Sequence, residues 1–203
     1  MLYYWPNRPI LIPPDPDAPL DPKPDYINSL EKSGKYIAEQ KWNGDNTLIY
    51  TDDLSFWNRH GEKIHRYTPP AEQMKQLKRI PKGGIINLEL LHFRIKDVKY
   101  KNTLLIHSLL GWDGVPMAGK TWGDARLILE DIFKTLKFPK DSGIILSPVW
   151  KKGFWKLYQD ADGEIIEGIV LKDPKGKLVI SASKIADVHY MKKIRKPSKK
   201  YQF

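Results

Sequence analysis

The 203-residue sequence contains no cysteine, which excludes disulfide bonds and thiolate metal ligands and fits a reducing compartment. No apolar run approaches the ~18 residues that a membrane-spanning helix needs, so we expect no membrane partner. The first residues, MLYYWPNRPILIPP, lack a basic segment followed by a long apolar one, so no secretory signal is expected. These absences favour a globular protein that folds around an ordinary apolar core.

Acidic residues are outnumbered, with 24 Asp and Glu against 34 Lys and Arg, which gives a formal net charge of +10. The excess is greatest near the end of the chain, where residues 192–200 read KKIRKPSKK. Such a charge balance favours a polyanionic partner, nucleic acid before an acidic membrane surface. A basic tail that only improves solubility is the alternative.

The apolar pattern predicts an α+β fold in which antiparallel sheets are flanked by helices. Residues 1–24 are rich in proline, so we expect an extended N-terminal arm there, a single domain over 25–197 and a basic tail over 198–203. Helical spacing predicts a short helix after Pro70, with Met74, Leu77 and Ile80 on its apolar face, and a longer helix over 121–136. The apolar face predicted for the longer helix contains Leu127, Leu129, Ile132, Phe133 and Leu136. Strands are predicted at 35–42, 46–51, 54–59, 84–95, 102–112, 143–150, 164–173 and 177–184, with turns at 162–163 and 175–176.

Four charged residues interrupt these apolar strands: Lys41, Glu89, Glu167 and Lys172. Charged groups are seldom buried without a partner or a chemical task. Two carboxylates and two lysines in one cleft would neutralise each other, and they could also hold a metal-bound phosphate. Each residue taken alone could instead lie at a strand edge and face water. Lys-x-x-Gly occurs at three places in the chain, so this pattern by itself decides nothing.

The order of the motifs carries more information than any one of them. EQKWNG at 39–44 is followed by WNRHGE, NLELL, TLLIHSLLGWDG, EGIVLK at 167–172 and MKKIRKP. Over residues 36–197 this series resembles the covalent nucleotidyltransferase superfamily, which comprises ATP-dependent DNA ligases, RNA ligases and mRNA capping enzymes. The resemblance implies a nucleotidyltransferase domain, of the ATP-grasp-like adenylation type. Because the chain stops after the last motif, we expect no C-terminal OB-fold domain.

The resemblance also implies roles for individual residues. Lys41 would be the nucleophile that attacks the α-phosphate of ATP and holds AMP. Arg59 would contact the ribose and the 5′-phosphate of a polynucleotide. His107 stands where an adenine-stacking residue is expected, although Ile106 could take that role and a core histidine is equally compatible. The other implied ATP contacts are Glu39, Gln40, Trp42, Glu89, Glu167, Lys172, Lys193 and Arg195, and Glu89 and Glu167 are also candidate metal ligands.

The motifs do not agree on the type of strand. Asn46, two residues after the motif glycine, is the form seen in many phage-type RNA ligases, whereas WNRHGEKI and EGIVLKDP look more like DNA ligases. The register of the last basic motif is open among Lys192, Lys193 and Arg195. Contacts to nucleic acid are expected from Asn46, Arg59, Lys192 and Lys196.

The sequence therefore predicts an ATP-dependent polynucleotide ligase that seals nicks in DNA, RNA or a hybrid duplex through a lysyl-AMP intermediate, with ATP and Mg²⁺ or Mn²⁺. A capping-type guanylyltransferase and a non-catalytic nucleic-acid-binding module of the same fold are the alternatives. We expect a monomer. Without an OB-fold domain, the Pro-rich arm, the basic tail or a separate OB-fold partner would supply the missing contacts to nucleic acid. The expected location is the cytoplasm, or the host cytoplasm if the protein is viral.

Overall fold

The computed structural model describes residues 3–12, 24–93, 97–181 and 183–196. These residues belong to two compact units, each assembled from separate stretches of the chain. The first unit comprises Met1–Asn7, Gly44–Ser147 and Lys177–Ala186, and the second comprises Arg8–Asn43, Pro148–Gly176 and Asp187–Phe203. Among the described residues, no helix combines the length and the apolar character needed to cross a membrane.

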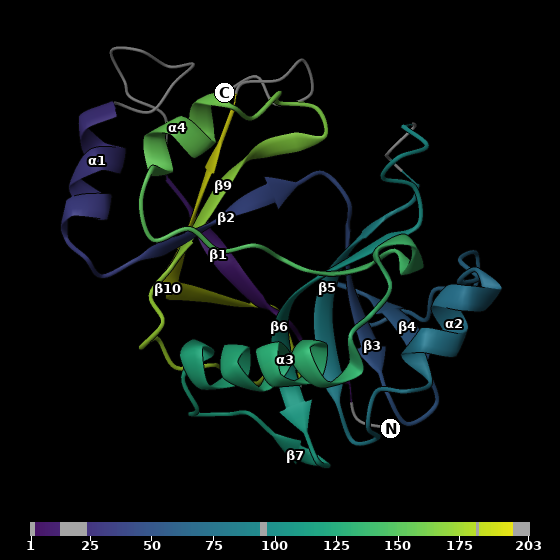
Figure 1. Cartoon of the computed structure of the whole chain (residues 1–203). Helices are drawn as coiled ribbons and strands as arrows, with labels where there is room; N and C mark the ends of the chain where they lie inside the picture. Colours follow the sequence, from purple (N-terminus) through teal and green to yellow (C-terminus); the bar gives the residue numbers. More distant parts are fainter. Residues whose placement is uncertain (1–2, 13–23, 94–96, 182, 197–203) are drawn as a thin grey trace. The chain divides into compact units, whose positions relative to one another are not determined.

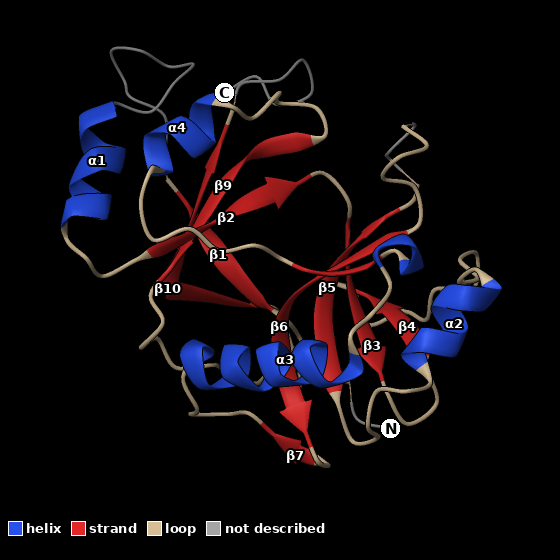
Figure 2. Cartoon of the chain, in the orientation of Figure 1, coloured by secondary structure: helices blue, strands red, loops and turns tan. Residues whose placement is uncertain are grey.

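The first unit is built on a six-stranded sheet with the order β4-β3-β5-β6-β7, in which β8 pairs with β6 (Figures 1 and 2). All of its pairings are antiparallel except that of β6 with β8, which is parallel. The apolar runs predicted to be strands form its central strands and are buried. The strands are β3 (Asp45–Tyr50), β4 (Ser55–Asn58), β5 (Ile85–Leu91), β6 (Thr103–Trp112), β7 (Val115–Pro116) and β8 (Ile144–Leu146).

The predicted long helix is α3 (Trp122–Leu136), which packs against β6. Thr121 and Asp124 form a reciprocal capping box at its start, and the Thr121 hydroxyl holds the pKa of the Asp124 carboxyl below its usual range. Leu129 is buried as predicted, but Leu127 is 65% exposed, so its assignment to the apolar face is wrong. The buried residues of α3 include Arg126, whose guanidinium donates a hydrogen bond to the backbone oxygen of Ser147 at 2.8 Å. The shorter elements of this unit are α2 (Ala71–Leu77) and the 3-10 turn Lys140–Ser142.

The second unit has a four-stranded sheet with the order β1-β10-β9-β2. Helices α1 (Pro24–Lys32) and α4 (Phe154–Gln159) lie side by side in Figure 1 and contact each other. Their apolar residues join those of the sheet in one core, which contains Ile27, Ala38, Phe154, Leu157, Tyr158, Ile169, Leu171 and Ile194. The strands are β1 (Asn7–Leu11), β2 (Ile37–Trp42), β9 (Ile166–Lys172) and β10 (Ala186–Arg195).

Several segments differ from the sequence prediction, among them the ten-residue strand β10, which was not among the predicted strands. Helices α1 and α4 were not predicted, since α1 begins at a proline that reads as part of the arm and α4 has only six residues. Residues 177–184, predicted as a strand, form only isolated bridges at Lys177 and Ser181. Here the side-chain amide of Asn7 bonds both the N–H and the C=O of Val179, in place of a neighbouring strand.

The predicted N-terminal arm contributes β1, which extends the sheet of the second unit beside β10. The remainder of the arm, residues 13–23, and the predicted basic tail at 198–203 lie outside the described residues. The predicted domain boundaries stay predictions.

Candidate active site

The sheet of the second unit has one apolar and one charged face. Lys41 on β2 and Arg195 on β10 are both paired with Gly168 on the central strand β9. Because side chains alternate along a strand, Lys41 and Arg195 share the face opposite to that of Ala38 and Ile194, which lie in the core with α1 and α4. The charged face carries Glu39, Lys41, Lys172, Lys193 and Arg195.

A β-bulge brings Glu167 to the same face. The register pairs Lys41 with Gly168 but Trp42 with Ile166, so Glu167 is the extra residue on β9. Unbroken alternation would place Glu167 beside Ile169 in the apolar core, whereas a bulge redirects a side chain at this point. Bulges of this kind are enriched next to active sites, and this one places a carboxylate beside Lys41 and Arg195.

Gly168 is required by this geometry. Its φ of +143° lies in a region that residues with a side chain rarely adopt. A Cβ at this position would also lie 2.1 Å from the backbone oxygen of Ile194 on β10. The glycine of the EGIVLK motif therefore allows β10 to approach β9 beside the bulge.

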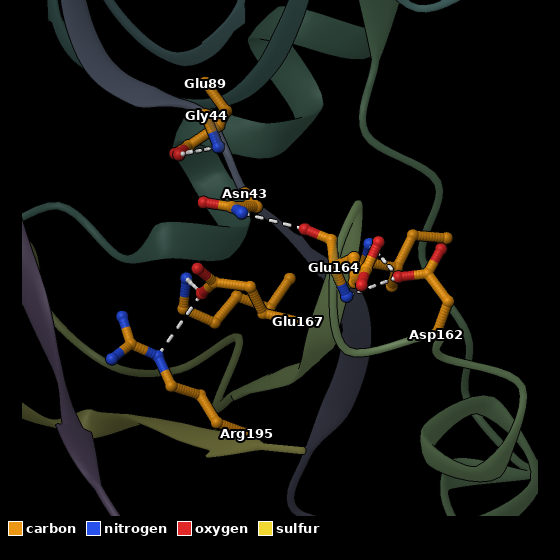
Figure 3. Close-up of polar contacts among 9 residues, drawn as sticks. Asn43, Gly44, Glu89, Asp162, Glu164, Glu167 and Arg195 are labelled. Carbon is orange, nitrogen blue, oxygen red and sulfur yellow. Dashed lines mark hydrogen bonds and ion pairs between the residues drawn. The ribbon is translucent and has the colours of Figure 1, made fainter. Parts of the chain in front are cut away.

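Lys41, Glu167 and Arg195 form one ionic cluster. The Lys41 Nζ donates a hydrogen bond to the Glu167 carboxylate, and the Arg195 Nε lies 3.3 Å from the same carboxylate oxygen (Figure 3). The side chains are 16% exposed for Lys41 and 6% for Glu167. The Lys41 amine is thus held beside a carboxylate, and part of its side chain stays exposed.

Two residues that the sequence prediction did not assign shape the turn before Glu167. The Asp162 Oδ1 accepts hydrogen bonds from the backbone N–H groups of 164–166, at 2.7 to 3.0 Å. The Asn43 Nδ2 donates to the backbone oxygen of Glu164 at 2.8 Å (Figure 3). The Asp-Gly pair at 162–163 was the available signal, because an aspartate in a turn commonly bonds the following backbone amides.

Lys172 and Glu39 form a second ion pair on the charged face. The Lys172 Nζ donates to the Glu39 Oε2 at 2.9 Å, and each side chain is 4% exposed. Both residues were among the ATP contacts that the resemblance implies. The structure brings the two residues together in a buried pair on β2 and β9.

The pairing of β10 with β9 places the basic residues of the last motif on different faces of the sheet. Lys193 is paired with Val170 and shares the face of Lys41 and Arg195, whereas Lys192 is paired with Leu171 and belongs to the opposite parity. Burial, together with the neighbouring charges of Arg195, Lys41 and Arg8, lowers the pKa of Lys193 to about 8. Arg8 is held in turn by Asp187, at 2.6 and 2.8 Å.

Lys196 lies directly after β10. Its backbone N–H donates to the backbone oxygen of Glu167 at 2.7 Å, and its Nζ donates to the backbone oxygen of Gln159 at 3.1 Å. The same ammonium lies 5.2 Å from the centre of the Tyr158 ring. Lys196 therefore fastens the end of β10 to β9 and α4.

In the first unit, Glu89 and Asn46 are opposite each other on β5 and β3. The Glu89 Oε1 accepts the backbone N–H of Gly44 at 3.0 Å (Figure 3), and a Cβ on Gly44 would lie 2.7 Å from the Glu89 Cγ. Asn46 donates to the side-chain oxygen of Asn87 at 3.1 Å. The glycine of the first motif thus permits close contact with Glu89.

His107 is the extra residue of a second bulge, since β5 pairs Asn87 with Ser108 and Leu88 with Ile106. It is half-buried, and the bulge interrupts the alternation at the position where an adenine-stacking residue was predicted. Arg59 follows β4 in an exposed turn of the same unit. The remaining candidates belong to β2 of the second unit, where Gln40 is paired with Ile169 and Trp42 is half-buried at the bulge.

No group of three or more histidine or acidic residues that could hold a metal ion occurs in the described parts of the chain. The predicted metal ligands, Glu89 and Glu167, belong to different units, and each already has polar partners. Their role as metal ligands stays a prediction.

No family model and no curated protein matches the sequence. Solved structures do match. A Lig E DNA ligase, described as binding DNA with a minimal scaffold, has a TM-score of 0.58 at 12% identity over 80% of this chain and 62% of its own. The ligase domain of LigD from M. tuberculosis has 0.56 at 12% identity over 79% and 53%. The ATP-dependent DNA ligase of bacteriophage T7, solved with ATP, has 0.54 at 14% identity over 94% and 68%.

These similarities establish the fold. The chain shares the fold of ATP-dependent DNA ligase domains, which confirms the predicted α+β class of antiparallel sheets flanked by helices and agrees with the resemblance seen in the motifs. The chain spans 62% and 53% of the first two of these proteins. At identities this low, their activities and substrates do not transfer with the fold.

Proposed function

We propose that this chain is an ATP-dependent polynucleotide ligase that carries AMP on Lys41. The observation that carries the proposal is the ionic cluster of Lys41, Glu167 and Arg195, held on one face of a sheet by a bulge and a glycine. This cluster occurs in a fold shared with ATP-dependent DNA ligases, one of which is solved with ATP. An amine held in position among other cations is suited to attack on a phosphate, and this function explains the arrangement better than a purely structural role would.

The first step would be attack of the uncharged Lys41 amine on the α-phosphorus of ATP. The N–P bond forms, the bond from the α-phosphorus to the bridging oxygen breaks, and pyrophosphate leaves with the electron pair. Glu167, hydrogen-bonded to the amine, is the group that would take its proton. Lys193 and Arg195 would stabilise the negative charge that develops on the phosphates.

The second and third steps would seal the strand. An oxygen of the polynucleotide 5′-phosphate attacks the α-phosphorus, the N–P bond breaks, and Lys41 regains its proton. The 3′-hydroxyl then attacks the activated 5′-phosphorus, its proton is lost, and AMP leaves. For Arg59, Glu89, Asn46 and His107 of the first unit we retain the roles that the resemblance implies. For Lys172 and Glu39 we propose a supporting role, since each already neutralises the other.

A divalent cation would enter this reaction with the nucleotide. Mg²⁺ is commonly held by one or two carboxylates together with substrate phosphates, and it neutralises charge on the leaving pyrophosphate. Glu89 and Glu167 are the carboxylates that could contribute. This arrangement fits a chain in which the described residues form no protein-only metal cluster.

Intact-protein mass after incubation with ATP and Mg²⁺ tests the proposal. We expect an increment of the size of AMP, which Lys41→Ala abolishes. Lys120→Ala is a matched control, because Lys120 also begins a Lys-x-x-Gly sequence but is exposed at the start of α3. An increment with GTP instead of ATP would favour the capping-type alternative. No increment with either nucleotide would contradict covalent catalysis and favour a nucleic-acid-binding module.

The strand type is decided by a separate assay. The adenylated protein is mixed with four nicked duplexes that differ in whether the 3′-hydroxyl strand and the 5′-phosphate strand are DNA or RNA. Sealing of any of them supports ligase activity, and the ratio of rates assigns the preference. If the charged protein seals none of the four while the T7 enzyme seals its own substrate in parallel, nick sealing is the wrong reaction.

A further inference from the structure

Aromatic residues near the N-terminus lie against the turn that carries Arg59. The Tyr3 hydroxyl donates a hydrogen bond to the backbone oxygen of Asn58 at 2.7 Å. A Cβ on Gly61 would lie 3.5 Å from the Tyr3 ring and 3.7 Å from the Trp5 ring, so both rings cover the backbone of the turn. Arg59 lies in the sequence between Asn58 and Gly61, the two residues contacted by these rings, and it is exposed.

The turn over residues 58–62 depends on Asn58. Its side-chain oxygen accepts the N–H groups of His60 at 2.8 Å and Glu62 at 3.0 Å, and its backbone oxygen accepts the N–H of Gly61 at 3.1 Å. Gly61 has a φ of +79°, which completes the reversal of the chain. Tyr3 therefore bonds the same backbone oxygen that closes the turn.

The aromatic segment is itself fixed by contacts that do not involve the turn. The Trp5 N–H donates to the backbone oxygen of Ser181 at 2.8 Å, and the Tyr4 N–H donates to the Tyr50 hydroxyl at 3.0 Å. The rings of Tyr3 and Trp5 meet edge to face with their centres 5.1 Å apart. Burial raises the pKa of Tyr3, so its hydroxyl keeps the proton that it donates.

We propose that Tyr3 and Trp5 are positioning residues for Arg59. They hold the 58–62 turn in one conformation, so that the guanidinium is already placed to bind a phosphate of the polynucleotide. An arginine on an unsupported turn would lose conformational freedom on binding, and this cost is reduced when the turn is fixed in advance. The inference rests on the proposed function, because the phosphate contact of Arg59 is part of it. Tyr3 and Trp5 touch no substrate.

Amide hydrogen exchange tests whether the contact holds the turn, without any need for activity. Tyr3→Phe removes one hydroxyl and leaves the ring, and Tyr26→Phe on α1 is the matched control. Loss of one hydrogen bond should accelerate exchange at Gly61 and Glu62 by about fivefold. Unchanged exchange at both amides in Tyr3→Phe, and again in Trp5→Ala, would overturn the proposal.

Binding to nicked duplexes tests whether the turn acts through Arg59. The readout is the ratio of Kd values for a 5′-hydroxyl and a 5′-phosphate nick, which requires no catalysis. Tyr3→Phe should lower this preference severalfold in the wild-type background and leave it unchanged in Arg59→Ala. An equal effect in both backgrounds, or no preference in the wild type, would refute positioning. Failure of ATP charging with a normal preference would refute the proposed function alone.

Discussion

Two lysine–glutamate pairs join the same two strands of the second unit, and they differ in what surrounds them. Lys172 and Glu39 are each 4% exposed and hydrogen-bond each other at 2.9 Å. The Lys41 side chain is 16% exposed, and its partner Glu167 also faces Arg195 at 3.3 Å. Both pairs come from charged residues in otherwise apolar strands, so a sequence pattern alone does not separate them.

The difference shows how one fold can use the same residue types for structure and for chemistry. In the buried pair of Lys172 and Glu39 the two charges neutralise each other, so its removal should act mainly on stability. A pair with surplus cations and an accessible amine keeps a net positive charge for an anionic ligand. The bulge at Glu167 on β9 creates the more exposed, positively charged pair. Its lysine, Lys41, lies only two residues after Glu39 on β2.

The largest expected effect is on AMP charging, which should require Lys41. Lys41→Arg keeps a cation beside Glu167 but removes the nucleophilic amine, because a guanidinium stays protonated. We expect AMP charging to be abolished while the midpoint of thermal unfolding stays close to that of the wild type. The measurements are intact mass and a melting curve. Retained charging in Lys41→Arg would place the nucleophile elsewhere and remove the contrast between the pairs.

The second prediction concerns the buried pair, for which we expect a loss of stability. Lys172→Met leaves Glu39 buried without its partner, which should lower the free energy of unfolding by about 3–5 kcal/mol. The double variant Lys172→Met/Glu39→Met replaces the pair by apolar side chains and should recover most of that loss. Urea unfolding measures both values. A loss below about 1 kcal/mol in the single variant would show that the pair is more hydrated than its burial indicates.

The sequence predicts most of the strands and helices α2 and α3 because their apolar periods are clear, and the order of the motifs singles out Lys41 and Glu167 as candidates. It does not predict which charges meet. Strict alternation would place Glu167 in the core beside Ile169, and only the pairing of β2 with β9 reveals the bulge. Asn43 escaped prediction for a similar reason, because its hydrogen bond to Glu164 depends on two distant segments being adjacent. The hydrogen bonds of Asp162 are local to its turn, and the Asp-Gly pair was the signal for them.

The strand predicted at 177–184 failed for a different physical reason. Its residues have the composition of a strand, but a side-chain amide from Asn7 takes the backbone bonds of Val179 that a neighbouring strand would use. Composition describes what a segment favours, and tertiary contacts decide whether a partner is present.

A third prediction uses pH to sharpen the contrast, since Lys193 adds a titratable charge to the open pair. With the pKa of Lys193 at about 8, the side chain loses its charge as the pH rises past that value. The affinity for a non-hydrolysable ATP analogue should therefore fall by up to about tenfold between pH 7 and 9. Lys193→Arg should remove this fall, and Lys192→Arg, on the opposite parity of β10, should not. A pH dependence that survives in Lys193→Arg would assign it to another group.

The same pKa makes a statement about stability. The pKa of Lys193 in the folded chain lies below its ordinary value of 10.5, so the folded state releases this proton first as the pH rises. The contribution of Lys193 to the free energy of unfolding should therefore increase from about pH 8 to 10.5. Binding and stability should change in opposite directions over the alkaline range, which distinguishes loss of a ligand contact from unfolding.

The smallest expected effect concerns Arg8, which joins the charged face from β1. Arg8 lowers the pKa of Lys193 through its charge, whereas its partner Asp187 raises it. Arg8→Ala removes a cation that lowers the pKa of Lys193 and leaves Asp187, which raises it, without its arginine partner. Both effects should move the midpoint of the pH dependence upward, by less than about one unit. Asp187→Asn removes the opposing anion and should move the midpoint downward. Because the pair is exposed, neither variant should change the unfolding midpoint appreciably. A shift of the same sign in both variants would mean that β1 has been displaced, and Arg8 would then act on Lys193 through packing instead of charge.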